Sequence, residues 1–318
     1  MTAMEYLALK NGSDVRGVAT EGVEGQPVTL TEEAVENIAK AFCVWLVSHT
    51  GKTRVRVAVG HDSRITAKPL CDAVVKGITS TGHNAVVTGL STTPSMFALL
   101  KDETRMAEIV CHGSVMITAS HLPFNRNGFK FFTAEGGFEG SDITKILEYA
   151  EANEFDFKDG GLITKVNYIQ KYADDTAKKI RKDTGLEKPF EGMKIAVDAG
   201  NGSGGFYATM LEELGADISG SKFLEPDGNF PNHAPNPENA QAMECISNAV
   251  KNAGADFGVI FDTDVDRAAC VGKGGFEINR NRLVALASII ALENNQGGTI
   301  VTDSVTSTGL SVFSGVVT

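Results

Sequence analysis

The sequence has no CxxC pair, no long apolar run and no excess of positive charge. Its five cysteines are odd in number and widely spaced, so we expect neither a disulfide framework nor a zinc site. No segment is long and apolar enough to cross a bilayer, and no charged-then-apolar leader follows Met1, so we expect a soluble cytoplasmic protein. The net charge of −11 disfavours general attraction to nucleic acid or anionic membranes. An anionic ligand would therefore need a local cationic pocket.

The chain of 318 residues is too long for one ordinary core. Helical and strand-like segments alternate along it, which is typical of α/β sheets whose functional loops follow the carboxyl ends of strands. We predict tandem similar α/β domains with mixed, mainly parallel sheets: a first at 1–165, a second at 166–276 and an incomplete third at 277–318. In the first, strands are expected at 54–60, 84–90 and 114–118 and helices at 31–51, 67–78 and 94–102.

The later part of the chain repeats this alternation. Strands are expected at 193–199, 257–262 and 299–303, and helices at 168–182, 206–214, 239–254 and 281–293. Only fifteen residues follow Asp303, too few to complete a third unit. The apolar residues Ile300, Val301, Leu310, Val312 and Phe313 are then expected to lack partners.

A glycine-rich loop follows the strand expected at 193–199. Gly200, Gly202 and Gly205 form GxGxxG, and Glu225 lies twenty residues further on, in outline the dinucleotide-binding fingerprint of a Rossmann-type NAD-dependent oxidoreductase. An ordinary βα turn needs the same glycines for positive φ and close packing. We favour the turn.

Three aspartates at alternate positions follow the strand expected at 257–262. Asp262, Asp264 and Asp266 offer the oxygen donors that Mg²⁺ prefers, and Arg267 adds a positive charge. A solvated acidic turn is disfavoured because neighbouring carboxylates repel one another without a cation. A haloacid-dehalogenase-type phosphatase with Asp262 as nucleophile is a minor alternative. Such an enzyme needs a lysine and an acidic pair well downstream of the nucleophile, and only 52 residues follow Asp266.

The stretch "ITASHLPFNRNGFK" (117–130) is expected to bring together Ser120, His121 and Lys130 in one loop. Each alone is common in turns or on surfaces. With Arg16 of "DVRG" and Arg64 of "GHDSR" they would supply the cationic pocket that an acidic protein needs for phosphates. The combination favours phosphoryl chemistry.

Five motifs in this order resemble those of the α-D-phosphohexomutases of the phosphoglucomutase/phosphomannomutase type. They are "SDVRG", "TASHLPFNRNGFK", "DAGNGSGG", "PDGNFPNHAPNPE" and "DTDVDR". Two departures are Leu122, where Asn is usual, and Thr263, where Gly is usual. Neither removes a reacting group.

The resemblance implies an enzyme that interconverts hexose 1-phosphate and hexose 6-phosphate, with glucose or mannose as the sugar, through a phosphoserine and a hexose 1,6-bisphosphate. It implies that Ser120 carries the phosphate and, with Asp262, Asp264 and Asp266, binds Mg²⁺. Lys130 would be the general acid/base, helped by His121 and Arg16. The phosphate-binding residues would be Arg16, Arg64, Lys130 and Arg267.

The family has four domains, and its sugar-selecting and distal phosphate loops have no counterpart before Thr318. The resemblance therefore implies a shortened chain with impaired turnover, and it leaves sugar preference and oligomeric state open. Two alternatives also stay open: a non-catalytic sugar-phosphate-binding fragment and the Rossmann-type oxidoreductase.

Overall fold

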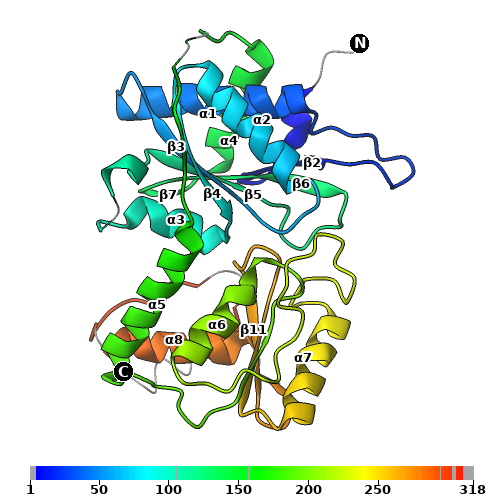
Figure 1. Ribbon diagram of the computed structural model, residues 1–318, viewed down its shortest axis with the longest axis vertical. Coiled ribbons are helices and arrows are strands. Elements are labelled where there is room, and N and C mark those ends of the chain that lie inside the picture. The colour runs from blue at the N-terminus through cyan, green and yellow to red at the C-terminus, as the bar shows by residue number, and fades with distance from the viewer. Residues whose placement is uncertain are drawn as a thin grey trace.

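The computed structural model describes residues 5–310 except 105, 157, 159, 279, 294 and 303–305. The molecule has two α/β units, which follow one another along its long axis (Figure 1). They are called the first layer (residues 5–167) and the second layer (from residue 168). Among the described residues no helix is both long and apolar enough to cross a membrane. The predicted α/β class with mixed sheets is confirmed.

The first sheet has eight strands. Its order is β1 (Lys10–Asn11), β2 (Asp14–Val18), β6 (Arg126–Thr133), β5 (Gly113–Ile117), β3 (Arg56–His61), β4 (Asn84–Leu90) and β8 (Ile163–Lys165), with β7 (Gly136–Gly137) beside β6. Strands β5, β3, β4 and β8 are parallel, whereas β6 runs antiparallel to both of its neighbours β2 and β5. The predicted boundary after residue 165 falls between β8 and the next helix.

Helices cover both faces of this sheet because its central strands are apolar on both sides. Val57 and Val59 of β3 pack toward α1 (Glu32–Thr50), α2 (Ala67–Ser80) and α4 (Gly140–Ala152), whereas Ala58 packs toward α3 (Thr93–Lys101). This alternation is the two-residue period of a strand. A fully buried central sheet results, as expected for strands flanked by helices on both faces.

Helix α1 has the ends that its sequence predicts. The side chain of Thr31 accepts a hydrogen bond from the backbone N–H of Ala34, and Gly51 takes a left-handed conformation directly after the helix. Trp45 of this helix stacks on His49 at 4.6 Å between ring centroids and contacts Phe138 at 4.4 Å. The only tryptophan of the chain therefore belongs to the first layer.

The second sheet has four strands in the order β12 (Phe276–Ile278), β11 (Ala268–Gly272), β10 (Phe257–Phe261) and β9 (Ile195–Asp198). Only the β9–β10 pair is parallel. Helices α5 (Tyr168–Thr184) and α6 (Phe206–Glu213) pack on one face and α7 (Ala240–Ala253) on the other. Short 3₁₀ turns complete the elements: η1 (Tyr6–Leu9), η2 (Ala107–Ile109) and η3 (Ser203–Gly205).

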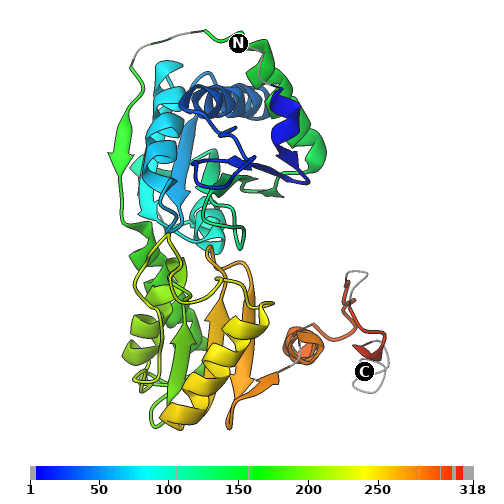
Figure 2. The ribbon, with the colours of Figure 1, turned by 90° about the vertical axis from the view of Figure 1, so that its right-hand side faces the viewer.

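Helix α8 (Arg280–Glu293) and the described residues after it lie beyond β12, to one side of the second sheet (Figure 2). The prediction of a strand at 299–303 is wrong for residues 299–302, which form no strand. Asp303 lies outside the described residues. A strand needs a neighbour for its ladder, and none of the described strands pairs with this segment. Val301 is 89% exposed, whereas Leu310 is buried; Val312 and Phe313 are outside the described residues.

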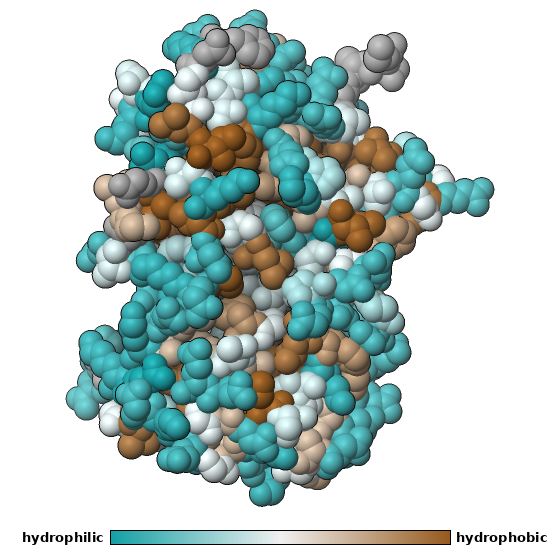
Figure 3. Space-filling view, in the orientation of Figure 1, coloured by the Kyte–Doolittle hydropathy of each residue, from teal (hydrophilic) through white to brown (hydrophobic). Residues whose placement is uncertain are grey.

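Most of the surface seen in Figure 3 is hydrophilic, with hydrophobic residues in separate groups, and the outline narrows between the two layers. The parts of the sequence that carry candidate site residues meet at this junction, as the contacts described next show.

Candidate functional site

Ser120 lies in the connection between β5 and β6. Its backbone is left-handed, with φ of 52°, and its N–H donates to Thr118 Oγ1 at 2.8 Å. Its hydroxyl donates to Asp262 Oδ2 at 2.6 Å and lies 3.3 Å from His121 Nδ1. The residue is only 5% exposed. A hydroxyl of the first layer is thus joined to a carboxylate of the second.

The three predicted aspartates lie in the turn between β10 and β11, and one ligand oxygen of each lies within 4.8 Å of those of the other two. Asp262 and Asp264 are fully buried, whereas Asp266 is exposed. Asp264 Oδ1 is buried without a hydrogen-bond partner among the described residues. Burial, followed by the charges of Asp264 and Asp266, raises the pKa of Asp262 to about 8. Converging carboxylates with an unpartnered oxygen fit a divalent cation.

Thr93, the first residue of α3, fixes the middle aspartate from the first layer. Its hydroxyl donates to Asp264 Oδ2 at 2.6 Å, and its N–H donates to the Asp264 carbonyl at 2.8 Å. The sequence reasoning missed this residue. The Thr92–Pro94 stretch signals a helix start, which is where an unpaired N–H is expected, but it does not reveal the distant partner.

Lys130 reaches the same carboxylates from β6. Its Nζ lies 3.1 Å from Asp266 Oδ2 and 3.4 Å from Asp14 Oδ2. Burial lowers its pKa, but Asp264, Asp14 and Asp266 outweigh burial and hold the pKa above its usual value. The expectation that Lys130 shares a loop with Ser120 is wrong, because Lys130 pairs with Met116 across two antiparallel strands. The strand brings it back beside the site.

Arg16 lies on β2, next to β6. Its guanidinium donates to Asp14 Oδ2 at 2.6 Å and to the Thr118 carbonyl. Asp14, which the sequence reasoning did not single out, therefore joins Arg16 to Lys130. Two cations and two carboxylates from both layers form one network.

His121 and Arg267 lie at the outer side of this network. Burial, and next the charge of Arg267, lowers the pKa of His121, which favours the neutral imidazole. Arg267 is exposed, and its Nη1 lies 3.9 Å from Glu238 Oε2. Its backbone N–H donates to Asp262 Oδ1 at 3.1 Å. The structure therefore brings together all the predicted site residues, but one of them faces the backbone of the Ser120 loop and not the carboxylates.

The exception is Arg64, which is 2% exposed. Its terminal nitrogens donate to four backbone carbonyls of the loop that holds Ser120, at 2.6–3.0 Å. Phosphate binding by Arg64 stays a prediction, and it is disfavoured because these bonds occupy the terminal nitrogens that a phosphate would contact.

The glycines of the GxGxxG motif pack against backbone. A Cβ at Gly202 would meet Thr263, and one at Gly205 would meet Leu224. Gly200 has φ of 53°, in the region that favours glycine. These contacts fill the space that a dinucleotide pyrophosphate would need, which supports the interpretation as a turn.

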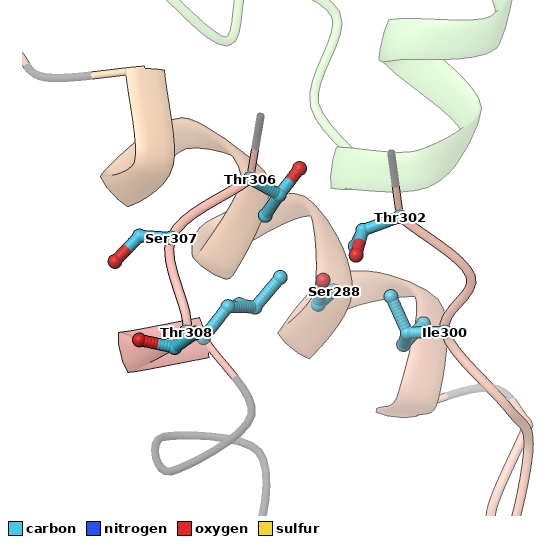
Figure 4. Close-up of a pocket in the computed structure, with 7 residues that line it drawn as sticks. Ser288, Ile300, Thr302, Thr306, Ser307 and Thr308 are labelled. Carbon is cyan, nitrogen blue, oxygen red and sulfur yellow. The ribbon is translucent and has the colours of Figure 1, made fainter. Parts of the chain in front are cut away.

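A hollow of about 290 Å³ lies between α8 and the segment after it. Figure 4 shows Ser288 of α8 facing Ile300 and Thr302, with Thr306–Thr308 on the other side. Its lining residues carry hydroxyl and aliphatic side chains and no titratable group. The hollow therefore lacks the chemistry found between the layers.

Comparisons with known proteins agree with the geometry. Residues 8–157 match the model of phosphoglucomutase/phosphomannomutase α/β/α domain I, and residues 168–275 match that of domain II. A phosphoglucomutase of Neisseria gonorrhoeae is 33% identical over 293 residues, and a phosphomannomutase/phosphoglucomutase of Pseudomonas aeruginosa PAO1 is 32% identical over 294 residues. These alignments cover 91% of this chain but 58% of either relative.

Among solved structures, a phosphoglucomutase/phosphomannomutase family protein of Burkholderia thailandensis matches with a TM-score of 0.79 and 27% identity. The match covers 91% of this chain and 60% of that one. Two consecutive domain models of one family thus match most of the chain. The chain belongs to the phosphoglucomutase/phosphomannomutase family.

Proposed function

We propose that this chain takes part in the interconversion of hexose 1-phosphate and hexose 6-phosphate, with Ser120 as the residue that carries the transferred phosphoryl group. The observation that carries this proposal is the 2.6 Å hydrogen bond between Ser120 Oγ and Asp262 Oδ2. It sets a hydroxyl at the edge of a buried carboxylate cluster that fits a cation. Relatives named for glucose and mannose mutases support those two sugars as substrates. Hexose 1,6-bisphosphate as the exchanging species is part of our proposal.

The cation would be Mg²⁺, held by Asp262, Asp264 and Asp266 together with the phosphorylated Ser120. When bound, the ion supplies positive charge that stabilises the transferring phosphoryl group. Asp264 Oδ1 is available to it, because that oxygen has no partner among the described residues.

The side chains of the chain supply the proton transfers and the orientation. As the phosphoryl group leaves Ser120 for a sugar hydroxyl, the serine oxygen must gain a proton and the sugar oxygen must lose one. Lys130, whose pKa is held high by its carboxylate neighbours, is protonated and is the group we assign to this exchange. Arg16 and Arg267 offer fixed charge to the phosphate, and neutral His121 lies beside the serine oxygen.

Incubation of the chain with glucose 1,6-bisphosphate tests the proposal directly. Intact mass and peptide mapping should show one phosphate on Ser120, and Ser120→Ala should remain unlabelled. Lys130→Ala should still bind the bisphosphate and should be labelled about 10²- to 10⁴-fold more slowly, the usual size of a general acid/base effect. Ser219→Ala and Lys145→Ala, both at exposed positions, are the matched controls.

Equal labelling of Ser120→Ala would contradict the assignment of the nucleophile. A wild-type chain that binds the bisphosphate without becoming labelled would support a sugar-phosphate-binding role instead. Hexose 1-phosphate conversion, measured for glucose and mannose in the same preparations, then reports whether labelling leads to net turnover.

A further inference from the structure

Arg64 lies in the segment between β3 and α2 and is fixed there by Asp62. Its backbone N–H donates to Asp62 Oδ1 at 3.0 Å, and its Nε lies 3.3 Å from Asp62 Oδ2. Both side chains are fully buried. Asp62 therefore fixes the orientation of the Arg64 guanidinium independently of the loop that its terminal nitrogens contact.

The far end of the guanidinium contacts the loop of Ser120 only through backbone oxygens. Nη1 donates to the carbonyls of Pro123 at 2.7 Å and Arg126 at 3.0 Å. Nη2 donates to the carbonyls of Ser120 and Leu122, both at 2.6 Å. Each terminal nitrogen has two hydrogens, so all four are used.

The loop requires such a partner because four carbonyl oxygens point to one place. Converging acceptors repel one another, and a buried carbonyl without a donor costs about 1–3 kcal/mol. The Ser120 backbone is also held at φ of 52°, a conformation that few non-glycine residues take. One planar cation with paired donors satisfies the four oxygens together.

The second layer closes over this arrangement. The Phe230 ring lies over the Arg64 guanidinium at 5.4 Å, and a Cβ at Gly228 would meet the backbone of residues 63–65. The loop of the second layer therefore packs directly on the segment that holds the nucleophile loop. This packing helps to keep Arg64 buried, with 2% of the residue exposed.

We propose that Arg64 is a positioning residue: it fixes the backbone of residues 120–126 so that Ser120 Oγ faces the carboxylate cluster. This role rests on the proposed phosphoryl transfer at Ser120. A positioning role and a phosphate-binding role predict different effects when Arg64 is replaced. Misplacing a reacting atom by about 1 Å lowers the rate on the order of 10²-fold, whereas losing a phosphate-binding group weakens binding of the bisphosphate.

The test compares Arg64→Lys and Arg64→Ala with Arg56→Lys. Arg56 is a matched control, since its Nη1 also donates to two backbone carbonyls, of Ala107 at 2.9 Å and Val110 at 3.0 Å, away from the site. With increasing glucose 1,6-bisphosphate, both Arg64 variants should show a maximal labelling rate of Ser120 about 10²-fold lower with an unchanged half-saturating concentration. Arg56→Lys should label like wild type. Millimolar guanidinium ion should restore part of the rate of Arg64→Ala and none of that of Arg64→Lys.

Hydrogen exchange measured by mass spectrometry supplies a readout that does not depend on activity. Backbone amides of residues 118–128 should exchange faster in Arg64→Lys than in wild type, with the second sheet unchanged. A raised half-saturating concentration with an unchanged maximal rate would overturn the proposal in favour of phosphate binding. Unchanged exchange in the loop would also overturn it. An unlabelled wild-type chain would instead reject the proposed function, while the exchange data would still decide whether Arg64 holds the loop.

Discussion

Two non-glycine residues with left-handed backbone flank the candidate site. Ser120 has φ of 52° and Val265 has φ of 64°. For a β-branched residue such as Val265 this conformation is a genuine outlier, and such strain persists only where surrounding contacts hold it. The Arg64 bonds supply those contacts for Ser120, and for Val265 the N–H bond to the Asp262 carbonyl at 3.3 Å contributes. The two turns meet where Ser120 Oγ donates to Asp262 Oδ2.

His233 provides a prediction about pH. Its Nε2 lies 3.1 Å from both oxygens of Asp198, its Nδ1 lies 2.9 Å from the Ala234 carbonyl, and its side chain is 1% exposed. Burial lowers the pKa of His233, but the hydrogen bond and charge of Asp198 outweigh burial and raise it above 6.5. Between pH 6.5 and the raised pKa the folded chain binds more protons than the unfolded chain, so the free energy of unfolding falls as pH rises.

The check is urea unfolding across pH 6–9 in wild type and His233→Gln. The stability advantage of wild type over the variant should be full below pH 6.5 and should shrink as pH rises through the raised pKa. An advantage that does not change with pH would mean that His233 is neutral in the folded chain.

At the scale of elements, we expect the β10–β11 turn to be more stable with a bound cation than without one. Asp264→Asn keeps an oxygen for the Thr93 hydroxyl but removes one carboxylate from a cluster whose mutual repulsion helps to raise the pKa of Asp262 to about 8. Unit charges 4 Å apart repel by about 1 kcal/mol in water and by about 4 kcal/mol at the protein surface. In EDTA this variant should therefore be more stable than wild type by at least about 1 kcal/mol in urea unfolding.

Mg²⁺ should reverse this order. An ion that binds the folded state raises the stability of wild type with concentration, and the variant should respond less. Asp174→Asn on α5, at an exposed carboxylate, should match wild type in both conditions within about 0.5 kcal/mol. Equal responses of wild type and Asp264→Asn would place the metal elsewhere.

The sequence predicts which chemical groups form the site better than it predicts how they are directed. Asp262, Asp264 and Asp266 follow a buried apolar strand, so their convergence can be read from local pattern. The alternation of Lys130 with buried Phe129 and Phe131 is a strand pattern, although the motif as a whole resembles a loop. Thr93 and the direction of Arg64 depend on partners far along the chain, for which no local pattern exists.

At the scale of the whole molecule, the site exists only where the two layers meet. Ser120, Lys130 and Thr93 come from the first layer and contact carboxylates of the second. Thr93 of the first layer, for example, both joins the layers and orients Asp264, one of the proposed metal ligands. Changes at this junction should therefore affect stability and metal affinity together.

Thr93→Val tests that link with a side chain of similar size. Losing a hydrogen bond to a buried carboxylate should cost about 1.5–3 kcal/mol of unfolding free energy and should weaken Mg²⁺ binding measured by calorimetry. Thr176→Val on α5 removes a hydroxyl bonded at 2.8 Å to the Tyr172 carbonyl within the same helix, and it should leave Mg²⁺ affinity unchanged. A Thr93→Val variant that binds Mg²⁺ like wild type would show that Asp264 needs no support from α3.

The position of Trp45 makes the two layers spectroscopically distinct. Its indole is in the first layer, against His49 and Phe138, and the second layer has no tryptophan because the chain has only one. Intrinsic emission excited at the indole band therefore follows unfolding of the first layer alone, whereas far-ultraviolet dichroism sums the helices of both. Superimposable denaturation curves from the two signals would mean that the layers melt as one cooperative unit. Curves that separate would mean that the layers unfold in distinct steps, and they would show which layer unfolds first without any label or substitution.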